Sequence, residues 1–221
     1  MGYEIDLEKI TLEEYKKLLK KQKLLAGRRL LKEDIDERFN MLYKAGITNV
    51  NILYSRLEDE QQLQEVSKAT GIPAEYLIIL KREISNILQK PVLIADFPYI
   101  SPPAFKKLGE NCIQTSRDFY ELSQGCTKPE SAQAKTGISL NDAQELCVLC
   151  DLIRINGVGP VFSRVLLEAG FRKTDEIAAA SADLIYEKTS EINKLHAYTR
   201  AIPEISEIQL CIDFAGLLVK T

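Results

Sequence analysis

Apolar residues recur three and four positions apart along most of the chain, and no segment alternates strictly between apolar and polar residues. The first spacing places apolar side chains on one face of an α-helix, whereas alternation would indicate a half-buried strand. The sequence therefore predicts an all-α fold. We expect helices over residues 11–25, 34–44, 50–57, 60–70, 73–88, 103–108, 116–122, 140–155, 160–169, 174–180, 182–194 and 206–219.

One polar segment interrupts this pattern. Residues 123–136 contain Gly125 and Pro129 and show no helical period, which is typical of a loop. We therefore predict a linker over residues 126–136. It would separate an N-terminal helical region, residues 1–125, from a C-terminal domain, residues 137–221.

The chain also repeats itself weakly. Three stretches, at residues 44–53, 109–122 and 167–180, share a helix end, an Ile or Phe, and a short helix that begins near Thr or Ser. Two further stretches, at residues 69–80 and 135–146, each place a Thr-Gly-Ile turn before a helix. Three copies of one helical unit explain these similarities most simply.

Three of the eleven glycines lie in the segment RINGVGPVFSRVLLEAGF, residues 154–171. Gly157-Val158-Gly159-Pro160 predicts a tight turn, because proline suits the first turn of a helix and glycine tolerates left-handed backbone. Val158 should lie between the two helices that the turn joins. Gly170 should end the second helix.

These residues resemble a helix-hairpin-helix motif, and the similarity covers residues 152–177. The upstream units resemble degenerate copies: Tyr99-Ile100-Ser101-Pro102 occupies the turn in one, and LKEDIDERFNML contains no glycine. Residues 11–218 as a whole resemble an uncharacterised domain-of-unknown-function family of tandem helix-hairpin-helix units, the last well formed and the earlier ones degenerate. That resemblance implies a fold and no established activity.

In many relatives the motif implies sequence-independent binding of double-stranded DNA. The amides of Gly157, Gly159 and Val161 would then hold a phosphate around Val158, because a helix start favours negative charge. Arg154 and Arg164 are the nearest cations. Val161 and Phe162, however, stand where DNA-binding relatives commonly have Lys or Arg. The alternative is a protein-interaction module in which Phe162 and the leucines of the first helix contact a partner.

A second candidate surface is the basic stretch of residues 15–32, which contains no acidic residue. A solvated amphipathic helix, a nucleic-acid contact and a membrane-surface contact all fit this composition. Residues 174–221, in contrast, are acidic. The cations of the stretch are Lys16, Lys17, Lys20, Lys21, Lys23, Arg28, Arg29 and Lys32.

The remaining composition argues against catalysis. Formal net charge is −3 over 221 residues, and no export signal precedes the five cysteines, so we expect reduced thiols and a cytoplasmic location. Cys147 and Cys150 have redox or zinc-site spacing but lie in an apolar helical run, and His196 has no evident catalytic partner. We predict a non-enzymatic binding or scaffold protein without cofactor, metal or membrane partner.

Overall fold

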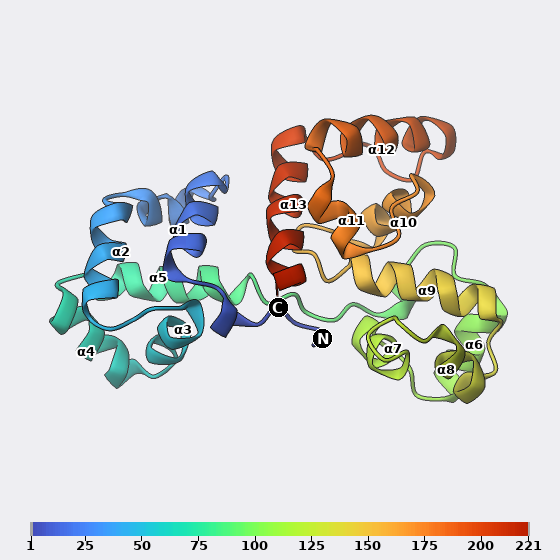
Figure 1. Cartoon of the computed structure of the whole chain (residues 1–221), viewed down its shortest axis with the longest axis horizontal. Coiled ribbons are helices and arrows are strands. Elements are labelled where there is room, and N and C mark those ends of the chain that lie inside the picture. Colours follow the sequence, from blue (N-terminus) through green and yellow to red (C-terminus); the bar gives the residue numbers. More distant parts are fainter. Residues whose placement is uncertain (1, 221) are drawn as a thin grey trace. The chain divides into compact units, whose positions relative to one another are not determined.

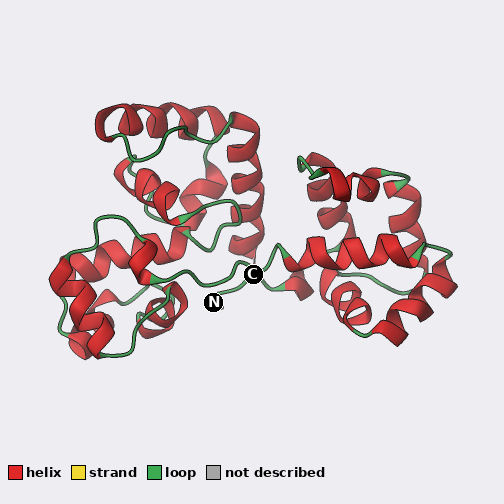
Figure 2. Ribbon diagram, turned by 180° about the vertical axis from the view of Figure 1, so that it is seen from behind, coloured by secondary structure: helices red, strands yellow, loops and turns green. Residues whose placement is uncertain are grey.

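The computed structural model describes residues 2–220, and within them every regular element is a helix (Figure 2). The predicted all-α fold is confirmed. Short 3-10 helices are η1 (Leu7–Lys9), η2 (Ala26–Lys32) and η3 (Ile94–Asp96). The α-helices are α1 (Leu12–Lys21), α2 (Ile35–Lys44), α3 (Val50–Glu58), α4 (Glu60–Thr70), α5 (Ala74–Ser85), α6 (Pro102–Glu110), α7 (Ser116–Leu122), α8 (Pro129–Thr136), α9 (Leu140–Leu152), α10 (Pro160–Glu168), α11 (Thr174–Ala179), α12 (Ala182–His196) and α13 (Ile205–Lys220).

Capping side chains set several of the helix starts. Thr11 accepts a hydrogen bond from the Glu14 amide at 3.2 Å, and the Glu14 carboxylate accepts one from the Thr11 amide at 3.0 Å. Thr115 and Asp118 repeat this reciprocal arrangement at α7. Each pair satisfies amides that the helix itself leaves without a partner.

The first predicted helix ends earlier than expected. Helix α1 stops at Lys21, and Gln22 has an extended ψ of 140°. The ammonium group of Lys32 donates to the carbonyl of Lys20 at 2.7 Å, which satisfies one terminal acceptor of the helix. The basic stretch is therefore a helix, a bend and η2 rather than one amphipathic helix, and Leu25 in the bend is 71% exposed.

The chain divides into two compact units at a position other than the predicted one. One unit comprises residues 5–88 and 220–221, and the other comprises residues 89–219 together with the first four residues. The predicted linker, residues 126–136, lies inside the second unit, where residues 129–136 form α8. Pro129 starts this helix and Gly137, with φ of 70°, ends it. Its two buried residues are too few to give a visible period in the sequence.

The same closing turn joins three helix pairs: α2 to α3, α6 to α7, and α10 to α11. In each, a residue with positive φ follows the first helix, namely Gly46 at 82°, Cys112 at 59° and Gly170 at 93°. The next amide then donates to a carbonyl five residues earlier, which is the Schellman closure of a helix end. The donors are Ile47, Ile113 and Phe171, and the acceptors Leu42, Leu108 and Leu166, at 3.2, 3.0 and 3.0 Å.

Helix α9 is the central element of the unit that carries the glycine hairpin. It packs against α7 and α8 and also against α10 (Figure 1). Its apolar residues Leu146 and Leu149, with Ile153 directly after the helix, join Phe119 of α7 in the core of this unit. The other unit has its own core, which includes Tyr15, Leu42, Leu53, Leu57 and Leu77.

Candidate functional site

The glycine hairpin between α9 and α10 has the geometry that its sequence predicts. Val158 is 1% exposed, and its amide donates to the carbonyl of Ile155 at 3.0 Å. Gly157 has φ of 93°, which an L-residue adopts only at a cost. Pro160 occupies the first turn of α10.

The start of α10 is open on one side. Gly159 forms its N-cap without a side-chain hydrogen bond, and Gly157, Gly159 and Val161 are all exposed. Helix α13 covers the other side: a Cβ at Gly157 would lie 2.9 Å from the Cys211 sulfur. The amides proposed to hold a phosphate thus begin a helix whose first N–H groups have no intrahelical acceptor.

Arg154 has a different role from the one expected. Its side chain is 2% exposed, and its guanidinium donates to the Tyr3 carbonyl at 2.9 Å, the Gly2 carbonyl at 3.1 Å and the Asp151 carboxylate at 2.6 Å. The guanidinium also lies over the Tyr120 ring, 4.5 Å from its centroid. Arg154 therefore fastens the N-terminal residues to α9 and offers no charge to a phosphate.

Arg164 and Phe162 are also used internally. The Arg164 side chain is 3% exposed, donates twice to the Pro98 carbonyl and pairs with Glu145 at 2.7 Å. Phe162 is 8% exposed. The structure thus corrects two expectations, cationic support from Arg154 and Arg164 and a partner contact by Phe162. Sequence spacing assigns side chains to a helix face but does not say which other segment covers that face.

The basic stretch lies in the other unit, and ion pairs there neutralise much of its charge. Asp36 pairs with Lys20 at 2.7 Å and with Lys16 at 3.2 Å, and hydrogen bonds from these ammonium groups lower the pKa of Asp36. Arg28 pairs with the buried Glu83 at 2.6 Å. Among the other predicted contacts, Lys17 lies 4.0 Å from Glu13, and Lys17, Lys21 and Arg29 are exposed.

Charge is also unevenly divided. Residues 1–4 and 89–219, which form the unit with the glycine hairpin, carry 13 basic and 18 acidic side chains. Residues 5–88 carry 15 basic and 14 acidic side chains. The hairpin therefore belongs to the acidic unit, whose field repels a polyanion.

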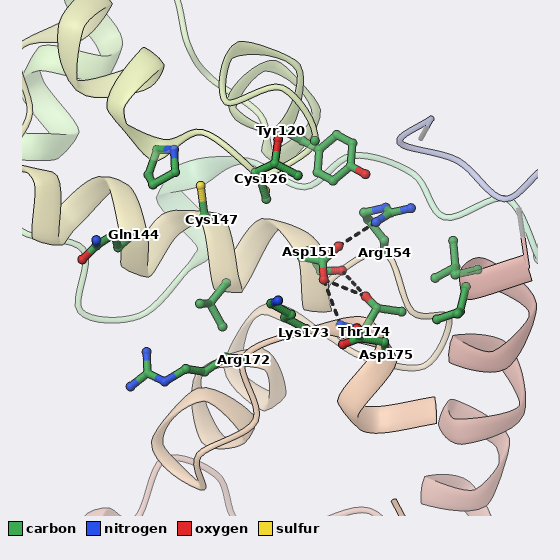
Figure 3. Close-up of a pocket in the computed structure, with 16 residues that line it drawn as sticks. Tyr120, Cys126, Gln144, Cys147, Asp151, Arg154, Arg172, Lys173, Thr174 and Asp175 are labelled. Carbon is green, nitrogen blue, oxygen red and sulfur yellow. Dashed lines mark hydrogen bonds and ion pairs between the residues drawn. The ribbon is translucent and has the colours of Figure 1, made fainter. Parts of the chain in front are cut away.

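A pocket of about 530 Å³ opens in the same unit, beside α9 (Figure 3). At its wall the Asp151 carboxylate accepts hydrogen bonds from the Thr174 amide at 2.9 Å and the Thr174 hydroxyl at 3.0 Å, while also pairing with Arg154. Asp151 was not a predicted site residue, because nothing in the sequence brings the end of α9 to the start of α11. The pocket wall also includes Cys126, Cys147, Gln144, Arg172 and Lys173.

An exposed aromatic cluster is the second feature that the sequence did not indicate. Tyr99, 72% exposed, packs edge-on against Tyr198 with ring centroids 5.4 Å apart, and His196 lies 5.4 Å from Tyr198 on centroids. Leu195, next to His196, is 75% exposed. We call Tyr99, His196 and Tyr198 the aromatic patch.

Two properties distinguish the aromatic patch from scattered surface residues. Tyr99 has φ of 63°, which is a genuine outlier for a bulky side chain. Burial, together with the nearby carboxylate of Glu168, raises the pKa of Tyr198, so its hydroxyl stays protonated at neutral pH. The patch thus presents aromatic rings, and Tyr99 is held there by a strained backbone.

No curated protein and no solved structure matches the chain significantly. Across residues 2–220, no helix has the length and apolar character needed to cross a membrane. Residues 98–217, more than half of the chain, match the family described as "Domain of unknown function (DUF4332)". The chain therefore belongs to the DUF4332 family.

Proposed function

We propose that this chain is a non-enzymatic binding module that contacts a partner protein through the aromatic patch. The observation that carries the proposal is Tyr99, a large aromatic side chain that is 72% exposed and held at positive φ. Such backbone costs about 1–2 kcal/mol and persists only where the surrounding structure imposes it, most often at functional sites.

The composition of the patch fits a protein interface. Tyrosine is enriched at protein interfaces because its ring provides rigid contact area and its hydroxyl a polar end. Exposed apolar side chains that cluster on a soluble domain commonly mark such a surface. Glu168 and Glu145 lie near Tyr198 but both pair with Arg164, so the partner segment should offer chiefly an apolar anchor.

The test compares proteins captured by the purified chain and by variants of the patch. We expect Tyr99→Gly and Tyr198→Ser each to weaken capture of the same partner by at least about tenfold, as truncation of interface anchors does. Tyr43→Ser is the matched control, because Tyr43 is 62% exposed and lies in α2, in the other unit. Capture unchanged by both patch variants would reject the proposal.

A stability measurement separates binding from folding in the same variants. Tyr99→Gly relieves the positive-φ strain, so the midpoint of unfolding should stay constant or rise while partner capture falls. A large fall in the midpoint would instead show that Tyr99 serves mainly to pack the fold.

A second candidate function is weak, sequence-independent binding of double-stranded DNA by the glycine hairpin. The observation that favours it is the start of α10, where Gly159 is exposed and no side chain forms a capping hydrogen bond with the helix amides. With this second function we also propose that the chain is built of tandem helix-hairpin-helix units. This architecture is supported by positive φ at Tyr99 and Gly157, each of which lies three residues before the proline that starts a helix.

Substitution of Val161 tests the second function. Val161 is 39% exposed, and changing it leaves the buried arginines Arg154 and Arg164 intact. Val161→Glu should abolish binding of a DNA duplex at low salt, and Val161→Lys should strengthen it and steepen its salt dependence. Failure of the unmodified chain to bind duplex at low salt would eliminate this function. The five free cysteines support a reducing compartment such as the cytoplasm for either function.

A further inference from the structure

Two cysteines meet in the pocket beside α9. Cys126, in the loop after α7, and Cys147, on α9, both line this pocket, and Cys126 packs against the core cluster that contains Cys147. Cys147 projects from α9 toward the loop that carries Cys126 (Figure 3). The Ser123 hydroxyl lies 3.7 Å from the Cys126 sulfur, so the pair belongs to a small polar network.

The loop that carries Cys126 is strained. Gln124, Gly125 and Cys126 have successive φ values of 52°, 72° and 60°. Two of the three are L-residues, for which this conformation is unfavourable. Strain of this kind points to a function, because neighbouring contacts must hold the loop in place.

The environment makes the two thiols unequal. The neighbouring Cys126 thiol lowers the pKa of Cys147, whereas Cys147 and burial raise the pKa of Cys126. Asp151 and Glu130 oppose the ionisation of Cys147. Cys147 is thus the thiol that ionises first, and the thiolate is the nucleophilic form.

We propose that Cys126 and Cys147 form a peroxide-sensitive thiol pair, in which Cys147 reacts first and Cys126 closes a reversible disulfide. This goes beyond the proposed binding functions and does not depend on them. The pocket volume of about 530 Å³ is many times that of a water molecule, so a small hydroperoxide can enter.

The chemistry balances in two steps. The Cys147 thiolate attacks one oxygen of the hydroperoxide, the O–O bond breaks, and the other oxygen leaves with a proton, giving a sulfenic acid on Cys147. The Cys126 sulfur then attacks the Cys147 sulfur and loses its proton, while the S–O bond breaks and water leaves. Two thiols are oxidised and one peroxide is reduced. A dithiol reverses the bridge by thiol–disulfide exchange.

The experiment uses the full chain with hydrogen peroxide as the probe. Cys112→Ser is the background, because Cys112 is exposed and would react on its own. After peroxide treatment, peptide mapping should find Cys126 linked to Cys147, and dithiothreitol should restore both thiols. In this background Cys126→Ser should accumulate a sulfenic acid on Cys147 that dimedone traps, and Cys147→Ser should lose the rapid reaction.

Cys211→Ser in the same background is the control, because Cys211 is as buried as Cys147 but does not line this pocket; it should keep the disulfide and its rate of formation. Peptide mapping of the Cys112→Ser protein involves no substitution in the pocket. It therefore shows whether the Cys126–Cys147 disulfide forms even if a pocket variant folds poorly. The proposal would be overturned if peroxide oxidised the exposed Cys112 of the unmodified chain while Cys126 and Cys147 remained reduced. A bridge from Cys147 to Cys150 instead of Cys126 would also overturn it.

Discussion

Asp151 connects three parts of its unit through one side chain. Its carboxylate binds the Arg154 guanidinium at 2.6 Å and accepts from the amide and hydroxyl of Thr174. Arg154 in turn holds the carbonyls of Gly2 and Tyr3. A single carboxylate thus satisfies a buried cation and caps the first turn of α11.

Replacing Asp151 with alanine should therefore destabilise this unit strongly. The change leaves the Arg154 charge buried without its counterion, and breaking such a pair costs about 3–5 kcal/mol. Denaturant unfolding measures the loss. Asp175→Ala is the control, since Asp175 is exposed and should change stability by no more than about 0.5 kcal/mol. Equal effects from the two variants would contradict this role of Asp151.

At the scale of elements, helix ends with left-handed backbone recur at corresponding places. Gly46 and Gly170 close two of the three similar helix pairs, whereas Cys112 closes the third with φ of 59°. The hydrogen bonds of the three turns correspond, so the turn geometry is set by the closure and not by the residue that occupies it. Cys112 adopts a conformation that glycine would adopt without strain.

Cys112→Gly should consequently stabilise the chain by about 0.5–1 kcal/mol, because relief of the left-handed strain exceeds the extra backbone entropy lost by glycine. The expected result is a higher denaturation midpoint with an unchanged denaturant slope. Cys112→Ser is the matched variant: it removes the thiol, retains the strained backbone and should give no comparable gain. A gain of the same size in both would assign the effect to the thiol.

The two glycines of the hairpin should differ sharply when changed to alanine. Gly157→Ala introduces a Cβ 2.9 Å from the Cys211 sulfur at φ of 93°, so we expect a loss of about 1–3 kcal/mol. At Gly159 φ is −93° and nothing beyond its chain neighbours lies within 4 Å of the position that a Cβ would take, so Gly159→Ala should lose only the about 0.5–1 kcal/mol by which alanine is a poorer N-cap. Thermal unfolding of both variants measures the contrast, and similar midpoints would contradict it.

At the scale of the whole molecule, two units each have their own core. Leu53, fully buried in α3, belongs to residues 5–88, whereas Asp151 and the core around α9 belong to the other unit. Separate cores allow separate cooperative transitions, so one unfolding free energy does not describe the chain.

Calorimetry should therefore resolve two transitions that respond to different substitutions. Leu53→Ala should lower the unfolding free energy of its own unit by the roughly 2–5 kcal/mol typical of a truncated core leucine. Asp151→Ala should lower the unfolding free energy of the other unit by a similar amount. The double variant should lower both. If either single change shifted both transitions equally, the two units would unfold as one.

The local pattern of the sequence determined the elements. Apolar spacing predicted most of the helices, and Gly157-Val158-Gly159-Pro160 predicted a turn with Val158 buried. These features depend on residues close together in the chain, whose geometry local sterics and hydrogen bonding largely fix. The predicted linker over residues 126–136 was wrong because α8 is short and buries few residues.

Only the tertiary structure decided which side chains are available for binding. Arg154, Arg164 and Phe162 had plausible positions beside the hairpin, yet distant segments cover each of them: the Gly2 and Tyr3 carbonyls, for example, take up Arg154. The meeting of Cys126 with Cys147, and of Tyr99 with Tyr198, likewise joins residues far apart in the sequence. Local preferences carry no information about such contacts, because they arise when helices pack and exclude water together.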